Sequence, residues 1–345
     1  MISAFFKDIG IDLGTANSLV YLKGRGVVVQ EPSIAAVNNK TGQVLAIGEE
    51  AKKMLSRTPQ HISVIRPLTN GVISDFEMTQ EMLRYFLKRV GKDRLFSYRR
   101  AILGIPGNLT EVERKSVEDA AVGAGVRTVH LIEEPVASAI GANLPIHEPT
   151  ANMVVDIGGG TTEIAIISMG GIVTSRSLKM AGDRMVGDIM QFVRDEFRLA
   201  IGEPTAEDVK VLVGSAVPMD GKMELAIRGR DLASGLPREI VIKNHQVRTA
   251  LMKSLKSITE AIREVIEVSP PELVGDILKN GIYFSGGGSL LRGIDTLVER
   301  ELGVKTSVVP DPLTCVMRGI GAIIEEFDRY RHVLDNPLRP REIKL

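Results

Sequence analysis

An aspartate followed by a glycine-containing turn occurs twice in this chain, each time between two apolar segments. The first copy is Asp12-Leu-Gly-Thr-Ala-Asn, between predicted strands at residues 9–13 and 18–22. The second is Asp156-Ile-Gly-Gly-Gly-Thr, between predicted strands at residues 153–157 and 164–167. A unit that recurs once at the scale of a domain predicts two similar lobes.

The length of the chain agrees with two lobes. With 345 residues it exceeds what a single simple core usually contains, so two domains or one large bilobal unit are expected. Hydrophobic residues make up 44% and charged residues 25%, which is ordinary for a soluble globular protein. The formal net charge is +0, whereas a general nucleic-acid binder is usually basic. We therefore expect no nucleic-acid partner.

Cysteine usage and hydropathy indicate the cellular compartment. The single cysteine, Cys315, excludes a disulfide framework and a cysteine-rich zinc site, and it fits a reducing cytoplasm. No apolar run reaches the ~18–20 residues that span a bilayer. The N-terminal residues lack the features of a secretory signal. We expect an intracellular protein.

The two turns have the composition of a phosphate site. Glycine leaves backbone N–H groups uncovered, and a concave set of such groups binds phosphate oxygens. Hydroxyl and amide donors accompany the glycines, at Thr15, Asn17, Ser18, Thr161 and Thr162. If Asp12 and Asp156 face one another, they can hold a hydrated Mg²⁺, which needs only one or two carboxylates.

Other folds explain the turns less well. Each turn alone could be a tight hairpin, but two copies and a third glycine cluster at residues 286–288 disfavour that interpretation. A dinucleotide fingerprint needs a helix after its glycines, whereas residues 163–167 have the pattern of a strand. The chain also lacks the Gly-x-x-x-x-Gly-Lys-Ser/Thr motif. Elsewhere, apolar spacing predicts helices over 77–90 and 251–266, and Thr110 with Glu113 predicts a capping box.

Four motifs in this order resemble the superfamily of actin, sugar kinases and heat-shock chaperones, and within it the MreB family of bacterial actins. They are Asp12-Leu-Gly-Thr-Ala-Asn, Leu131-Ile-Glu-Glu-Pro-Val-Ala-Ser-Ala-Ile-Gly, Asp156-Ile-Gly-Gly-Gly-Thr-Thr-Glu and Ser285-Gly-Gly-Gly-Ser-Leu-Leu-Arg-Gly. The similarity extends from about Asp8 to Gly321. It implies an α/β actin-like ATPase fold, with two lobes of duplicated ribonuclease-H-like domains around a nucleotide cleft.

The resemblance also implies a division into four subdomains, with a small one on each lobe. The expected boundaries are 1–31, 75–144 and 310–345 for subdomain IA, 32–74 for IB, 145–180 and 245–309 for IIA, and 181–244 for IIB.

The same resemblance assigns residues to ATP and Mg²⁺. The first phosphate loop matches Gly14, Thr15, Ala16 and Asn17, and the second matches Gly158, Gly159, Gly160 and Thr161. The adenine-side loop matches Gly286, Gly287, Gly288 and Ser289. Glu207 and Lys210 match the segment that reaches the ribose and base. Three residues apart on a predicted helix, they could equally form a surface ion pair.

The resemblance places four residues in catalysis: Asp12, Glu134, Asp156 and Thr161. Hydrolysis needs a group that orients the attacking water. Glu134 matches that position, Thr161 is expected beside the γ-phosphate, and Asp12 and Asp156 are expected to hold the metal through water. Glu133 is the neighbouring competitor for the water-orienting role. Both glutamates could instead merely favour a helix N-terminus.

A possible membrane contact lies after the 77–90 helix. Leu95 and Phe96 form an apolar pair among cations at residues 88, 89, 92, 94, 99 and 100, a combination suited to shallow insertion into an anionic leaflet. The same position resembles the membrane-insertion loop of the MreB family. Ile2, Phe5 and Phe6 could add an anchor. Alternatively, Leu95 and Phe96 fold back into the core.

By resemblance, the chain is expected to be a slow ATPase that polymerises into paired protofilaments. Its expected location is cytoplasmic, peripheral on the inner face of the cell membrane. There it would act with membrane proteins of the cell-wall elongation complex to direct wall synthesis and rod shape. A small-molecule kinase of the same superfamily is the alternative, although no further base for a substrate hydroxyl stands out. A chaperone-type ATPase would need a peptide-binding domain after residue 345.

Overall fold

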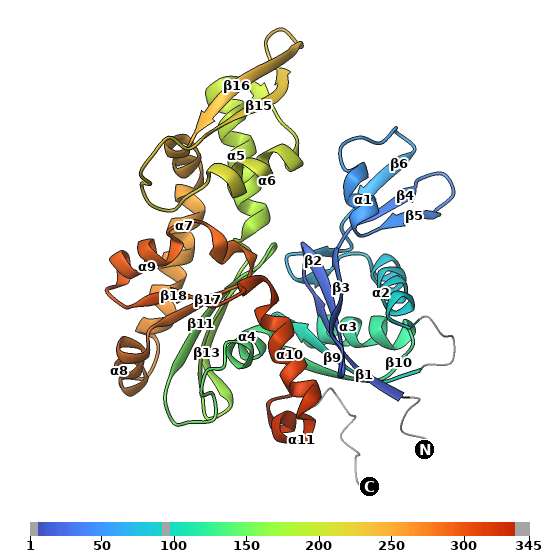
Figure 1. Ribbon diagram of the computed structural model, residues 1–345, viewed down its shortest axis with the longest axis vertical. Coiled ribbons are helices and arrows are strands. Elements are labelled where there is room, and N and C mark those ends of the chain that lie inside the picture. Colours follow the sequence, from blue (N-terminus) through green and yellow to red (C-terminus); the bar gives the residue numbers. More distant parts are fainter. Residues whose placement is uncertain (1–5, 92–96, 335–345) are drawn as a thin grey trace.

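The two largest sheets of the molecule share one strand plan (Figure 1). The computed structural model describes residues 6–91 and 97–334. The first sheet contains, in spatial order, β10 (Val126–Glu133), β9 (Ser97–Ile105), β1 (Phe6–Leu13), β2 (Asn17–Leu22) and β3 (Gly26–Pro32). The second contains β18 (Thr306–Val308), β17 (Ile282–Ser285), β11 (Asn152–Ile157), β12 (Thr162–Ser168) and β13 (Gly171–Leu178).

The pairing directions also repeat. In the first sheet β1, β2 and β3 form an antiparallel meander, while β9 and β10 run parallel to β1. In the second, β11, β12 and β13 form the meander, and β17 and β18 run parallel to β11. The strands predicted on either side of each aspartate are confirmed.

The register places the two aspartates at equivalent points. Asp12 lies opposite Leu19 on β2, and Asp156 lies opposite Glu163 on β12. Both aspartates stand near the C-terminal ends of their strands, where parallel neighbours end at the same edge of a sheet. The two copies of the motif therefore occupy equivalent positions, each at the C-terminal end of a strand in its own sheet.

Two helices cover the outer face of the first sheet. They are α2 (Phe76–Val90) and α3 (Glu111–Gly123). The helix predicted over 77–90 is confirmed, and its apolar residues are buried in a core shared with β1, β9 and β10. The predicted capping box is confirmed as well, because the Thr110 hydroxyl accepts from the Glu113 N–H while the Glu113 carboxylate accepts from the Thr110 N–H.

Two further helices lie between the sheets, α4 (Glu134–Gly141) and α10 (Cys315–Glu325) (Figure 1). They pack with backbone against backbone, since a Cβ on Gly141 would overlap the Cys315 carbonyl and one on Gly319 would overlap the Ala137 carbonyl. Their apolar side chains join a core that includes Leu19 of the first sheet and Val154 of the second. This pair of helices thus connects the two sheets.

The outer face of the second sheet is covered by α7 (Asn244–Glu267), α8 (Pro271–Asn280) and α9 (Ile294–Leu302). Two further helices, α5 (Gly182–Phe197) and α6 (Glu203–Val213), pack against one another and against α7. The predicted 251–266 helix is confirmed, but α7 begins seven residues earlier. The early part is polar, although Asn244 is buried and its amide donates to the Val213 carbonyl at 2.7 Å.

Smaller elements complete the fold. One three-stranded sheet, with α1 (Glu49–Met54), comprises β4 (Ala35–Asn38), β5 (Val44–Ile47) and β6 (Ile62–Ile65). Another comprises β14 (Leu199–Ala200), β15 (Glu224–Asp231) and β16 (Pro237–Lys243). The remaining elements are β7 (Leu68–Thr69), β8 (Val72–Ile73), α11 (Phe327–Tyr330), and the 3₁₀ turns η2 (Gly287–Leu290), η3 (Pro312–Thr314) and η4 (Arg331–Val333). Within the described residues, no helix has both the length and the apolar composition of a bilayer span.

Candidate nucleotide site

Four acidic side chains gather where the ends of β1 and β11 face the start of α4. They are Asp12, Glu134, Asp156 and Glu163. Burial raises the pKa of Glu134 well above its ordinary value, and the charges of Asp12, Glu163 and Asp156 add to the shift. The predicted residues Asp12, Asp156 and Glu134 are therefore brought together, with Glu163 as a fourth member.

Burial dominates the electrostatics of the two repeated aspartates. It raises the pKa of Asp12 from 3.8 to about 7, with a further contribution from Asp156. The pKa of Asp156 is also raised by burial, but the hydroxyls of Ser138 and Ser285 oppose this by each donating to Oδ2 at 2.7 Å. Asp156 is thus the better stabilised carboxylate of the two.

Glu163 is held by groups on both sides. The Ser177 hydroxyl donates to Oε1 at 2.6 Å, and the Gly107 N–H donates to Oε2 at 3.3 Å. Burial nevertheless raises its pKa from 4.5 to about 6. Sequence reasoning missed Glu163. The sequence feature that could have indicated Glu163 is its charge within an otherwise apolar strand. In the first copy of the motif, Leu19 occupies the equivalent position.

This acidic cluster fits a divalent cation. Burial raises the pKa values of these carboxyl groups, and repulsion between their charges adds to the rise, so a nearby positive charge would favour their ionised forms. A cation would supply that charge. The described residues contain no group of three or more His, Cys, Asp or Glu side chains arranged as metal ligands. Asp12 and Asp156 are the residues that would hold Mg²⁺, an ion that retains several waters and needs only one or two carboxylates.

The two glycine turns contact one another across this site. A Cβ on Gly159 would lie 2.7 Å from the Cβ of Ala16, and one on Gly160 would lie 2.5 Å from Oγ1 of Thr15. Side chains there would separate the turns. Thr15 was predicted as a donor, and in the structure its Oγ1 accepts from the Gly71 N–H at 3.0 Å. Gly71 and its neighbours thus join the site from a segment that the motifs did not indicate.

The third glycine loop lies against the end of β11. Gly286 has φ +77°, and a Cβ there would stand 2.6 Å from Oδ1 of Asp156. Gly287, Gly288 and Ser289 form η2, and the Ser289 hydroxyl donates to the Gly286 carbonyl at 2.7 Å. The structure therefore brings this loop to Asp156.

Lys210 and Glu207 form an ion pair close to the second turn. Nζ of Lys210 lies 2.7 Å from Oε2 of Glu207 and donates to the Gly182 carbonyl at 3.3 Å. Gly182 is the first residue of α5, and its N–H donates to the Gly158 carbonyl at 3.1 Å. The second turn thus adjoins both a helix N-terminus, which favours anions, and a lysine.

The adjacent glutamates Glu133 and Glu134 have different surroundings. The Arg114 guanidinium pairs with Oε1 of Glu133 at 3.1 Å. Glu134 instead interacts with the other acids of the cluster, and its Cγ lies 3.7 Å from where a Cβ on Gly104 would stand. The membrane pair Leu95–Phe96, together with Ile2 and Phe5, lies outside the described residues.

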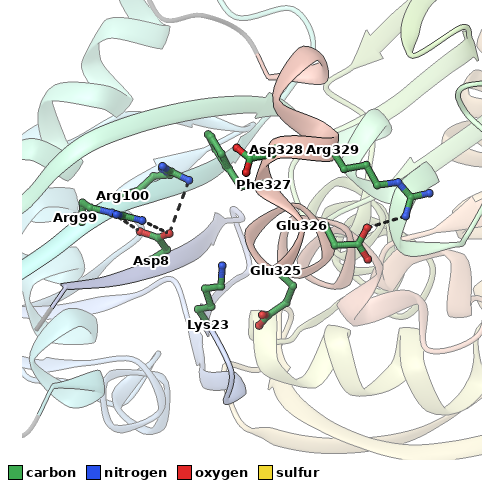
Figure 2. A pocket seen from close by; sticks show the side chains of 9 residues that line it. All are labelled: Asp8, Lys23, Arg99, Arg100, Glu325, Glu326, Phe327, Asp328 and Arg329. Carbon is green, nitrogen blue, oxygen red and sulfur yellow. Dashed lines mark hydrogen bonds and ion pairs between the residues drawn. The ribbon is translucent and has the colours of Figure 1, made fainter. Parts of the chain in front are cut away.

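A separate cavity of about 430 Å³ lies at the other end of β1 (Figure 2). Its lining is Asp8, Lys23, Arg99, Arg100, Glu325, Glu326, Phe327, Asp328 and Arg329. Asp8 accepts from Arg99 at 3.0 Å, and the Arg100 guanidinium stacks 3.4 Å from the ring centre of Phe327. Asp8 and Asp12 are four residues apart on one strand, on the order of 13 Å. The cavity is therefore distinct from the acidic cluster.

Comparison with known proteins identifies relatives over almost the whole chain. The family model "MreB/Mbl protein" matches residues 6–332. The cell shape-determining protein Mbl of Bacillus subtilis is 48% identical over 325 residues, which are 94% of this chain and 98% of Mbl.

Solved structures agree with the sequence comparison. MreB5 of Spiroplasma citri bound to AMPPNP superposes with a TM-score of 0.91 at 39% identity, over 95% of this chain and 98% of that one. The same protein bound to ADP gives 0.90. MamK, solved as a double helical filament, shares the fold with a TM-score of 0.79 at 23% identity, over 92% of this chain and 98% of that one. The predicted actin-like fold is confirmed.

Proposed function

Because the chain belongs to the MreB/Mbl family, we propose that it is an ATP-binding and ATP-hydrolysing cytoskeletal protein that polymerises and helps to determine cell shape. The observation that best supports this proposal is the acidic cluster beside two glycine turns that contact one another. The nucleotide-bound structures of MreB5 support ATP as the ligand.

Phosphate binding is assigned to the turns. The turns Gly14–Asn17 and Gly158–Thr161 touch one another, and the N-terminus of α5 adds a partial positive charge next to the second turn. Glu207 and Lys210 lie beside it, on the side expected for ribose and base. Gly286–Ser289 complete the site next to Asp156 on the adenine side.

Hydrolysis is assigned to Glu134 and Thr161. Asp12 and Asp156 would hold Mg²⁺ through water, and the ion would neutralise phosphate charge. Glu134 would then accept a hydrogen bond from the attacking water and align it with the γ-phosphate next to Thr161. Its place inside the cluster supports this choice over Glu133, which is paired with Arg114.

We assign the filaments to the inner face of the cell membrane, where membrane proteins of the wall-elongation complex are the expected partners. The absence of net charge means that copies do not repel one another globally. The filament structure of MamK, which shares the fold, supports self-association.

The hydrolytic assignment is tested by comparing Glu134→Ala with Glu133→Ala. Loss of a water-orienting carboxylate should slow phosphate release at least about tenfold while ATP binding persists. Glu133→Ala is the matched control, and its rate should stay closer to wild type. Equal rates for wild type and Glu134→Ala would rule out the assignment.

Sedimentation with ATP and electron microscopy test the polymer independently. Paired filaments that form with ATP and Mg²⁺ support the cytoskeletal function. A protein that stays monomeric and phosphorylates a small molecule would replace this proposal with the kinase alternative.

A further inference from the structure

Glu163 is the member of the acidic cluster to which the proposed nucleotide chemistry assigns no role. The residue is 2% exposed, and a buried charge is costly unless hydrogen bonds compensate it. The first sheet has Leu19 at the equivalent position, opposite its own aspartate. The strand plan therefore does not require an acid here, and the contacts of the carboxylate must explain it.

Two hydrogen bonds fix the carboxylate of Glu163, and a third links it to Thr161. The Ser177 hydroxyl, directly opposite on β13, donates at 2.6 Å, and the Gly107 N–H donates at 3.3 Å. The Thr161 hydroxyl makes the third and weaker hydrogen bond. Thr161 lies directly before β12 and two residues before Glu163, a spacing that puts side chains on the same face of a strand.

The Thr161 side chain is held on two sides. The residue is 8% exposed, and its methyl group faces Gly71, where a Cβ would lie 3.2 Å from Cγ2. Its hydroxyl hydrogen is directed to Glu163, so the lone pairs of Oγ1 remain for a hydrogen that approaches from elsewhere. Phosphate oxygens accept hydrogen bonds, whereas a water can donate one. In this orientation Thr161 therefore suits a water better than the γ-phosphate itself.

We propose that Glu163 is a positioning residue for hydrolysis, which orients the Thr161 hydroxyl so that Oγ1 accepts a hydrogen bond from the attacking water. This inference rests on the proposed ATPase function. The water would donate its second hydrogen to Glu134, a member of the same cluster. With both hydrogens held, a lone pair is left for the γ-phosphorus, and two fixed acceptors align the water better than one does.

Phosphate release and nucleotide affinity in variants of the full chain test this proposal. Glu163→Leu installs the residue type of the first sheet and removes the acceptor. Its kcat should fall at least about tenfold, while its Kd for AMPPNP with Mg²⁺ should stay within about twofold of wild type. A role confined to holding the strands together would instead weaken nucleotide binding along with the rate.

The conservative variant Glu163→Gln should rescue most of the activity. It keeps an oxygen toward Thr161, since the Ser177 hydroxyl can turn and accept from the new amide. Its kcat should therefore stay within about threefold of wild type.

A double-variant cycle shows whether Glu163 acts through Thr161. Thr161→Val keeps a methyl group toward Gly71 and removes the hydroxyl, so kcat should fall about as far as in Glu163→Leu. The double variant should be no more than about threefold slower than either single variant, because the effects of residues that act as a unit do not add. Thr174→Val, also on β13, is the matched control. The Thr174 hydroxyl accepts from Ser269 at 3.1 Å, and kcat should equal that of wild type.

Two results would overturn the inference while the proposed function stands. One is equal kcat in wild type and Glu163→Leu, and the other is a double variant slowed by the full product of the two single effects. Glu163→Met, of similar length and without charge, replaces Glu163→Leu if that variant folds poorly. A wild type that binds ATP and Mg²⁺ without releasing phosphate would instead contradict the proposed hydrolysis, and this inference with it.

Discussion

Asp12 is a member of the acidic cluster whose protonation links stability to pH. Its pKa rises from 3.8 to about 7 on folding, so the folded protein binds this proton more tightly than the unfolded chain does. The resulting stabilisation is complete below about pH 4 and is lost as the pH rises to 7 and beyond. Without metal and nucleotide, ionised Asp12 therefore destabilises the fold.

Asp12→Asn should remove this destabilisation. In EDTA at pH 8 we expect the free energy of unfolding to exceed that of wild type by ~1–4 kcal/mol, and the difference should shrink toward pH 5. Urea denaturation at several pH values measures it. The same variant should lose the stabilisation that Mg²⁺ and ATP give wild type. A difference between the two proteins that does not vary with pH would contradict the pKa assignment.

The site residues that could be predicted from the sequence are those that belong to the motifs. Asp12, Asp156 and Glu134 adjoin glycine turns or a recognisable helix start, and they do gather in space. Glu163 was missed because the burial of β12 on both faces depends on α4 and α7, which strand periodicity does not reveal. Gly71 and Gly107 were missed because their contacts are made across distant segments.

At the scale of elements, the contact between α4 and α10 tolerates the least change. Gly319→Ala should force the helices apart, because its Cβ would overlap the Ala137 carbonyl, which cannot move without shifting α4. We expect a loss of about 2–3 kcal/mol in the free energy of unfolding, measured in urea. Gly187→Ala is the matched control, since Gly187 is exposed in α5 with no atom near its Cβ position. It should be neutral or stabilising by up to ~1 kcal/mol. Equal effects of the two substitutions would show that the helices have room to separate.

Helices with one apolar face could be predicted from the sequence, whereas the packing partners of helices that are buried on all sides could not. The 77–90 helix has one apolar face, which its sequence spacing displays. In α4, by contrast, every residue from Pro135 to Gly141 is buried, so no periodic face indicates its partners. Its place between the sheets follows only from the packing of the whole chain.

At the scale of the whole molecule, attachment to a membrane surface remains a prediction. The described cations beside the Leu95–Phe96 segment are partly engaged, since Arg89 pairs with Glu31 and Arg99 with Asp8. Apolar insertion is therefore expected to matter more than charge.

Flotation with anionic liposomes tests this attachment. Leu95→Ser/Phe96→Ser should reduce the bound fraction at least tenfold, because shallow burial of two such side chains is worth ~2 kcal/mol or more. The control is Leu236→Ser, which removes a side chain 64% exposed in the turn between β15 and β16. If the double variant floats as wild type does, the anchor lies elsewhere.

The shared core around α4 and α10 also has a consequence for folding. Leu19 and Ile102 come from one sheet, Val154 and Ile167 from the other, and all belong to one continuous apolar cluster. Both sheets bury their inner faces against the same two helices, α4 and α10, so neither sheet can be covered without them. The chain should therefore behave as a single cooperative unit, whose two halves are interdependent as folding units although each repeats the architecture of the other.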